Sequence, residues 1–83
     1  MVRHWPNPAG DKIFLELSSD EKTVVSYQIL NFAGAVVAKS EVKLTAGSQT
    51  ILLPVSQLRS GIYYLQLTGE SLKQPVSFAF VKQ

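Results

Sequence analysis

The chain has 83 residues, which is enough for one small domain, and its 46% hydrophobic content can supply one core. Its net charge of +2 comes from basic residues scattered along the sequence, so we expect no nucleic-acid partner. The absence of cysteine excludes disulfide bonds, thiolate metal sites and a cysteine nucleophile. No apolar run is long enough for a membrane-spanning helix.

The first twelve residues are predicted to be an extended lead-in or linker. Pro6 and Pro8 fix their own φ angles and push the preceding residues toward extended geometry. Gly10 and Asp11 then favour a turn. The predicted division of the chain is therefore a lead-in at 1–12 and a β-sandwich domain at 13–83.

The rest of the chain alternates apolar and polar residues with a period of two, which predicts β-strands. The inward-facing residues predicted by this alternation are Ile13, Leu15 and Leu17; Val25, Tyr27 and Ile29; Val36, Ala38, Val42 and Leu44; Ile51, Leu53 and Val55; Tyr63, Leu65 and Leu67; and Val76, Phe78 and Phe80. The segment from Val36 to Leu44 fits either one bent strand or two short ones. Pro54 predicts a strand end or a sheet edge, because proline cannot donate to a β-ladder.

Turn signals recur about every 8–12 residues, as an all-β sandwich requires. The only helical feature that we expect is a single turn at Ser56, Gln57 and Leu58. The predicted fold is therefore an immunoglobulin-like β-sandwich of six to seven short antiparallel strands.

Few residues could carry chemistry, and we predict no enzyme, no catalytic residue, no metal site and no cofactor. The single histidine, His4, lies in the lead-in, whereas a catalytic triad needs a histidine held by packing. The acidic residues do not have the spacing of a calcium loop. We expect the Asp11 side chain to cap a backbone amide.

Two aromatic residues, Phe14 and Tyr64, fall on predicted outward faces. A coplanar pair could stack on sugar rings or cover a neighbouring domain. A carbohydrate-binding module and a structural immunoglobulin-like spacer therefore remain alternative functions.

Four short motifs in a fixed order carry a resemblance to a known family. The chain resembles the C-terminal sorting domains of the type IX secretion system, also called the Por secretion tail family. The opening Pro-Asn-Pro, the middle hairpin, a Leu-x-x-Gly-x-Tyr step and a near-terminal lysine all match, although the family usually has aspartate where Asn31 stands. The matching residues are Pro6, Asn7, Pro8, Asp11, Asn31, Gly34, Leu58, Gly61, Tyr63 and Lys82.

The resemblance implies a signal that directs an N-terminal cargo domain through the type IX translocon of a diderm bacterium. The cargo would reach the periplasm by a separate signal peptide, cross the outer membrane and be secreted or held at the cell surface. The implied partners are the translocon and the outer-membrane sortase and shuttle proteins. The sortase would remove the domain and attach the cargo to lipopolysaccharide.

The last strand is the segment where we expect recognition. A strand at a sheet edge presents unpaired N–H and C=O groups to which a partner can add a strand. We expect this contact at Phe78, Ala79, Phe80, Val81 and Lys82, where both faces of the strand are unusually apolar. The same edge predicts a weak homodimer.

Overall fold

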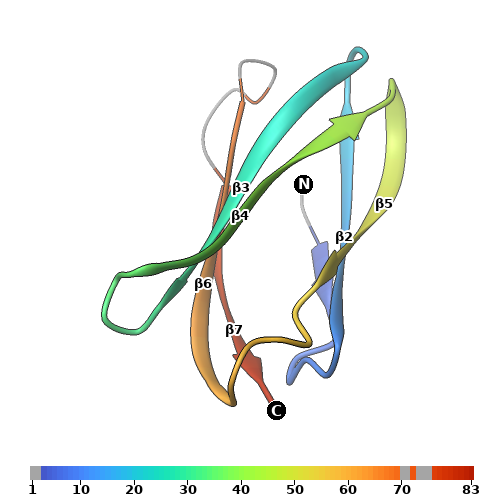
Figure 1. Cartoon of the computed structure of the whole chain (residues 1–83). Helices are drawn as coiled ribbons and strands as arrows, with labels where there is room; N and C mark the ends of the chain where they lie inside the picture. Colours follow the sequence, from blue (N-terminus) through green and yellow to red (C-terminus); the bar gives the residue numbers. More distant parts are fainter. Residues whose placement is uncertain (1–2, 70–71, 73–75) are drawn as a thin grey trace.

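The computed structural model describes residues 3–69, 72 and 76–83, and within them the chain forms seven β-strands and no helix (Figure 1). The strands are β1 (Arg3–Trp5), β2 (Lys12–Ser19), β3 (Thr23–Asn31), β4 (Val36–Leu44), β5 (Gly47–Pro54), β6 (Gly61–Thr68) and β7 (Val76–Lys82). The described part of the chain accordingly contains no helix that could span a membrane.

The strands form two antiparallel sheets that face each other. One sheet has the order β1-β2-β5, and the other has the order β4-β3-β6-β7. Figure 1 shows the two sheets as separate layers joined by the β2–β3 turn, by the β4–β5 turn and by the segment between β5 and β6. The predicted immunoglobulin-like β-sandwich is confirmed.

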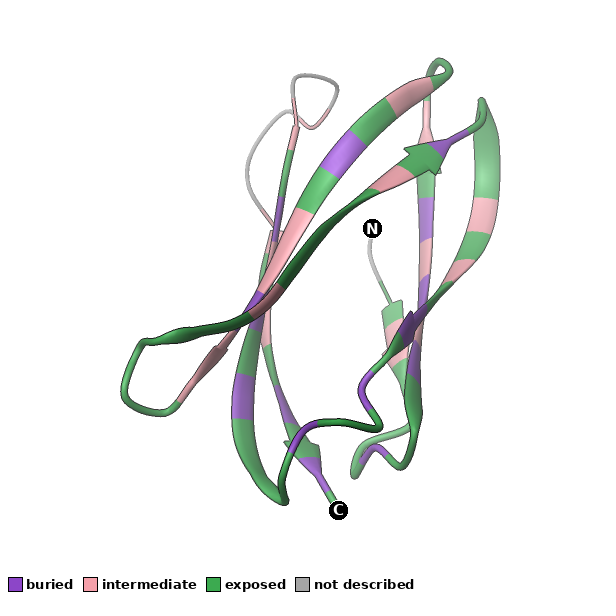
Figure 2. Ribbon diagram, in the orientation of Figure 1, coloured by how far each residue is buried: buried purple, intermediate pink, exposed green. Residues whose placement is uncertain are grey.

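The core lies between the sheets and is built from the alternating residues. Ile13 and Leu15 from one sheet and Leu65, Leu67 and Phe80 from the other are at most 1% exposed. In Figure 2 buried and exposed bands alternate along most strands, as the period-two pattern requires. The exception is β4, which is exposed along most of its length.

The structure decides between one strand and two for the segment from Val36 to Leu44, and it shows the role of Pro54. Val36 to Leu44 is one strand, and its register against β3 shifts between Ile29 and Leu30, which is a β-bulge. Pro54 ends β5, as predicted, and Val55 lies just past the strand but is fully buried.

The helical turn predicted at Ser56–Leu58 is wrong. The segment forms a single turn in which the Leu58 N–H donates to the Val55 carbonyl at 3.1 Å. Ser56 makes no side-chain hydrogen bond within the described part of the chain, and the following residues lead directly into β6 at Gly61.

The lead-in is extended, but its description as a linker is wrong. Arg3–Trp5 pairs with β2 as strand β1, and Ala9 is completely buried among the core residues. Residues 3–12 are therefore an integral part of the sandwich, which begins before the predicted boundary at residue 13. No alternation marks this segment in the sequence, because its two prolines interrupt the pattern.

Candidate functional site

The middle motif builds the β3–β4 hairpin. The Asn31 side-chain oxygen accepts hydrogen bonds from the N–H groups of Ala33 and Ala35, both at 3.0 Å. Gly34 has a φ of 86°, a backbone conformation that glycine adopts without steric cost. Because aspartate would offer the same acceptor, the structure explains why either residue suits this position.

The Leu-x-x-Gly-x-Tyr motif builds the entry to β6. Leu58 and Tyr63 are both 8% exposed, and the Tyr63 hydroxyl donates to the Arg59 carbonyl at 2.8 Å. Gly61, between them, has a φ of 156°. The arrangement is comparable to the tyrosine corner of immunoglobulin domains, where a tyrosine hydroxyl ties the chain to backbone a few residues upstream. The Tyr63 ring also stacks on Phe80 with centroids 5.7 Å apart.

The first and last motifs, which lie more than 70 residues apart, meet in space. The Asn7 side-chain oxygen accepts a hydrogen bond from the Val81 N–H at 3.0 Å. The Ala9 N–H donates to the Val81 carbonyl at 2.7 Å, and the Gln83 N–H donates to the Ala9 carbonyl at 2.9 Å. Ala9 and Lys82 form a parallel β-bridge. We call residues 7–9 and their bonds to residues 81–83 the terminal clamp.

The other residues of the opening motif flank this clamp. Pro6 and Pro8 lie on either side of Asn7, are exposed and follow cis peptide bonds. Asp11 was expected to cap an amide with its side chain. Instead its backbone carbonyl accepts a hydrogen bond from the Val55 N–H at 2.8 Å, and the side chain makes no hydrogen bond to the described residues.

The near-terminal lysine is buried rather than displayed. Lys82 is 8% exposed, because it continues the inward face of β7 after Phe78 and Phe80. Its ammonium group donates to the Gln83 carbonyl at 2.9 Å. A long lysine side chain can bury its methylene groups in this way while the charged end stays near the surface.

The predicted recognition strand is an edge strand, but its edge is only partly open. The clamp shows that Val81 directs its N–H and carbonyl away from β6. Because these directions alternate along a strand, Ser77 and Ala79 also direct their backbone groups outward. No strand in the described part of the chain pairs with them. The open edge therefore consists of Ser77 to Ala79, while the predicted positions at Val81 and Lys82 are closed by the clamp.

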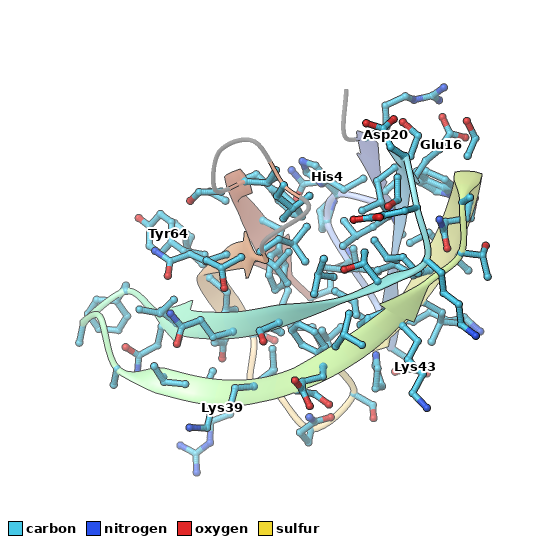
Figure 3. The ribbon with its side chains drawn as sticks, turned by 90° about the horizontal axis from the view of Figure 1, so that it is seen from above. His4, Glu16, Asp20, Lys39, Lys43 and Tyr64 are labelled. Atoms are coloured by element: carbon cyan, nitrogen blue, oxygen red, sulfur yellow. The ribbon has the colours of Figure 1, made fainter. Side chains whose placement is uncertain are left out.

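An apolar surface adjoins this open edge on the outer face of the four-stranded sheet. It consists of two residues of β6 and their partners on β7: Ile62 lies opposite Val81, and Tyr64 lies opposite Ala79. Ile62 is 52% exposed and Tyr64 is 43% exposed. Tyr64 projects away from the interior of the sandwich (Figure 3). We call these four residues the outer apolar patch.

The residues considered for other functions lie apart. Phe14 is half-buried and stacks on Trp5 at 5.7 Å on the three-stranded sheet, whereas Tyr64 lies on the other sheet. The two aromatic residues therefore do not share a platform. His4 points into the sandwich and stacks on Phe78 at 3.8 Å. No group of three or more potential metal ligands occurs among the described residues.

One open groove lies along β3, β4 and the end of β6 and has a volume of about 510 Å³. Gln28 is one of its lining residues, and the Gln28 amide donates to the Gln66 side chain at 2.8 Å. Its lining is mostly polar: Ser26, Tyr27, Gln28, Lys39, Ser40, Glu41 and Thr68. None of the motif residues lines this groove.

Sequence reasoning missed one residue that organises the site. Ala9 is buried and contributes two backbone hydrogen bonds to the clamp. The only available signal was its small size between Pro8 and Gly10, since a small side chain lets two backbone segments approach closely.

The fold and these contacts define a small immunoglobulin-like module whose distinctive residues build turns, strand ends and one sheet edge. A family model described as the secretion system C-terminal sorting domain matches residues 3–79. The chain therefore belongs to this family of type IX secretion sorting domains. Lys82 lies beyond the matched residues. Searches of curated proteins and of solved structures gave no match.

Proposed function

We propose that this domain directs an N-terminal cargo across the outer membrane by offering the open edge of β7 to the type IX machinery. Membership of the family supports the coarser function, a C-terminal sorting signal on a secreted or cell-surface protein. The observation that supports the finer proposal is that the backbone groups of Ser77 and Ala79 point away from β6, beside the outer apolar patch to which Ala79 itself belongs. A partner strand placed here gains backbone hydrogen bonds and apolar contacts together.

We also propose the later steps that the family resemblance implies. The cargo reaches the periplasm by a separate signal, and a surface sortase removes the domain and attaches the cargo to lipopolysaccharide. In this proposal the domain acts by being recognised and catalyses no reaction itself. The support is that its distinctive polar side chains, including Asn7, Asn31 and Tyr63, are already engaged in bonds to backbone groups.

A proline substitution tests the edge without cutting the clamp. The Ala79 N–H points outward, so Ala79→Pro removes a donor that the fold does not use. We expect a reporter fused to the Ala79→Pro domain to accumulate in the periplasm of a secretion-competent host. Thr50→Pro is the matched control, because Thr50 also directs its N–H outward from an edge strand, β5.

The readouts are reporter location and the circular dichroism spectrum and thermal midpoint of each purified domain. Export of the folded Ala79→Pro fusion at the level of the unaltered fusion would contradict recognition at the β7 edge. Equal loss of export for both folded proline variants would also contradict it, because the effect would not be specific to β7.

A further inference from the structure

The edges of the two sheets differ in how they are protected against pairing with another chain. Natural edge strands are typically short, covered, or interrupted by proline or by inward-pointing charges. β1 has only three residues, β7 is partly covered by the terminal clamp, and β5 ends in Pro54. By contrast, β4 has nine residues, contains neither proline nor glycine, and is unpaired on its outer side within the described part of the chain.

The backbone groups that β4 offers can be assigned from the hairpin. The Asn31 N–H donates to the Ala35 carbonyl, so the odd-numbered residues of β3 direct their backbone groups toward β4. Their partners include Ser40, opposite Tyr27, and Val42, opposite Val25. The intervening residues of β4 direct their N–H and carbonyl groups outward; these are Lys39, Glu41 and Lys43.

No inward-pointing charge blocks this edge. Ala38 and Val42 are half-buried against the core, and Ser40, which lies between them on the same face of β4, is exposed but uncharged. The charged side chains of β4 lie on the other face. Figure 3 shows Lys39 and Lys43 projecting outward from the strand. The charged side chains therefore leave the backbone edge of β4 accessible. Their alternating sign along the strand can be matched by opposite charges on a partner strand.

The pattern on β4 is complementary to itself. When two copies of a strand pair antiparallel about a two-fold axis through Ser40, Lys39 of each copy lies opposite Glu41 of the other. The same axis places Ala38 opposite Val42 and gives full overlap of the strand, because Ser40 is its midpoint. If the pairing shifts by two residues in one direction, Lys39 of one copy lies opposite Lys39 of the other. If it shifts by two residues in the other direction, Glu41 of one copy lies opposite Glu41 of the other. Opposite charges in facing positions stabilise a strand pair, whereas like charges destabilise it.

We propose that two copies of this domain associate through β4, in an antiparallel pair centred on Ser40, to give one continuous eight-stranded sheet. The occupant of the β4 edge is a second copy of this chain. This dimer uses a different edge from the β7 edge of the proposed sorting function, so association of the purified 83-residue chain tests it independently of secretion. It also differs from the homodimer predicted from the sequence, which used the last strand.

Charge reversal provides the main test. In the dimer, residue 39 of each copy faces residue 41 of the other, so either Lys39→Glu or Glu41→Lys creates two pairs of like charges. Each variant should therefore weaken association about tenfold or more. The double variant Lys39→Glu/Glu41→Lys restores both opposite-charge pairs and should associate as well as the unaltered chain. An equimolar mixture of the two single variants should form a mixed dimer for the same reason.

Sedimentation equilibrium at concentrations up to about 1 mM in low salt measures these dissociation constants, and about 0.5 M NaCl should weaken them. Circular dichroism confirms that each variant is folded. An unaltered chain that remains monomeric at the highest concentration overturns the proposal. So do folded single variants that dimerise normally, or a folded double variant that fails to recover.

A cysteine provides a second, geometric test. The proposed register makes Ser40 and Ser40 of the second copy a non-hydrogen-bonded pair, with Cα atoms about 4.5 Å apart, which is within disulfide range. Because the chain has no cysteine, Ser40→Cys introduces a unique thiol that should form a disulfide-linked dimer under mild oxidation. Ser48→Cys, exposed on β5, is the matched control and should cross-link more slowly. Equal cross-linking rates at both positions would contradict the register.

Discussion

The edge strands on the two long sides of this sandwich differ in how far their backbone groups are covered. On one side the terminal clamp ties the segment that follows β1 to the end of β7, and His4 of β1 stacks on Phe78 of β7. On the other side β4 and β5 are joined by a turn, and both strands keep outward-facing backbone groups. We call these the closed side and the open side. The comparison indicates that the proline-containing segment closes only the C-terminal end of the β7 edge, which leaves Ser77 to Ala79 and the whole β4 edge available to partners.

The largest expected difference between the sides concerns core packing. Phe80 is 1% exposed and stacks on Tyr63, so Phe80→Ala should lower the free energy of unfolding by about 3–5 kcal/mol. Val42 is half-buried on the open side, so Val42→Ala should lower the free energy of unfolding by only about 1 kcal/mol. Urea denaturation measures both values. Similar losses at the two positions would show that the core is not concentrated toward the closed side.

Overpacking the clamp should have the next largest effect. Ala9 has no exposed surface, so Ala9→Leu should destabilise the domain by about 1–3 kcal/mol. Ala46 is exposed in the β4–β5 turn, and Ala46→Leu should change stability by less than about 0.5 kcal/mol. Thermal and urea unfolding of the two variants provide the comparison. A tolerated leucine at position 9 would mean that the clamp is loosely packed.

Removing one clamp bond should have a smaller and more local effect. Asn7→Ala takes away the acceptor of the Val81 N–H and should cost about 1 kcal/mol. Amide hydrogen exchange at Val81 should become faster, while exchange in the β3–β4 hairpin stays unchanged. Asn7→Asp keeps an acceptor oxygen and serves as the control. Unaltered exchange at Val81 in the alanine variant would contradict the assigned bond.

The smallest effect is expected at the surface of β1. Arg3 and Glu16 form an ion pair at 3.4 Å, but their side chains are 65% and 45% exposed. A double-mutant cycle with Arg3→Ala and Glu16→Ala should give a coupling free energy below about 0.5 kcal/mol. A larger value would mean that this pair, in addition to the clamp, holds β1 in place.

Most strands could be predicted because their alternation is local. Ile13, Leu15 and Leu17 show by their spacing alone which face is buried, and all three are buried in the structure. The hairpin at Asn31 and Gly34 was equally predictable, because each residue has a turn preference that acts within a few positions. Lys82 also continues an inward-facing series, so its burial follows from the same rule.

The clamp could not be predicted because its partners are far apart in the sequence. Residues 7–9 have no alternation, and their hydrogen bonds go to residues more than 70 positions away. Ala9 therefore looked like part of a linker. The turn at Ser56 was misjudged because a serine at its start fits a tight turn as well as a helical one.

The parallel orientation of the bridge between Ala9 and Lys82 has a mechanical consequence. A force that pulls the two ends of the chain apart would draw the two bridged segments in opposite directions along their length. Such a load stretches the three bonds of the clamp together, in shear, instead of peeling them apart in turn. The bond directions therefore give the clamp its greatest resistance to tension applied between the two ends of the chain.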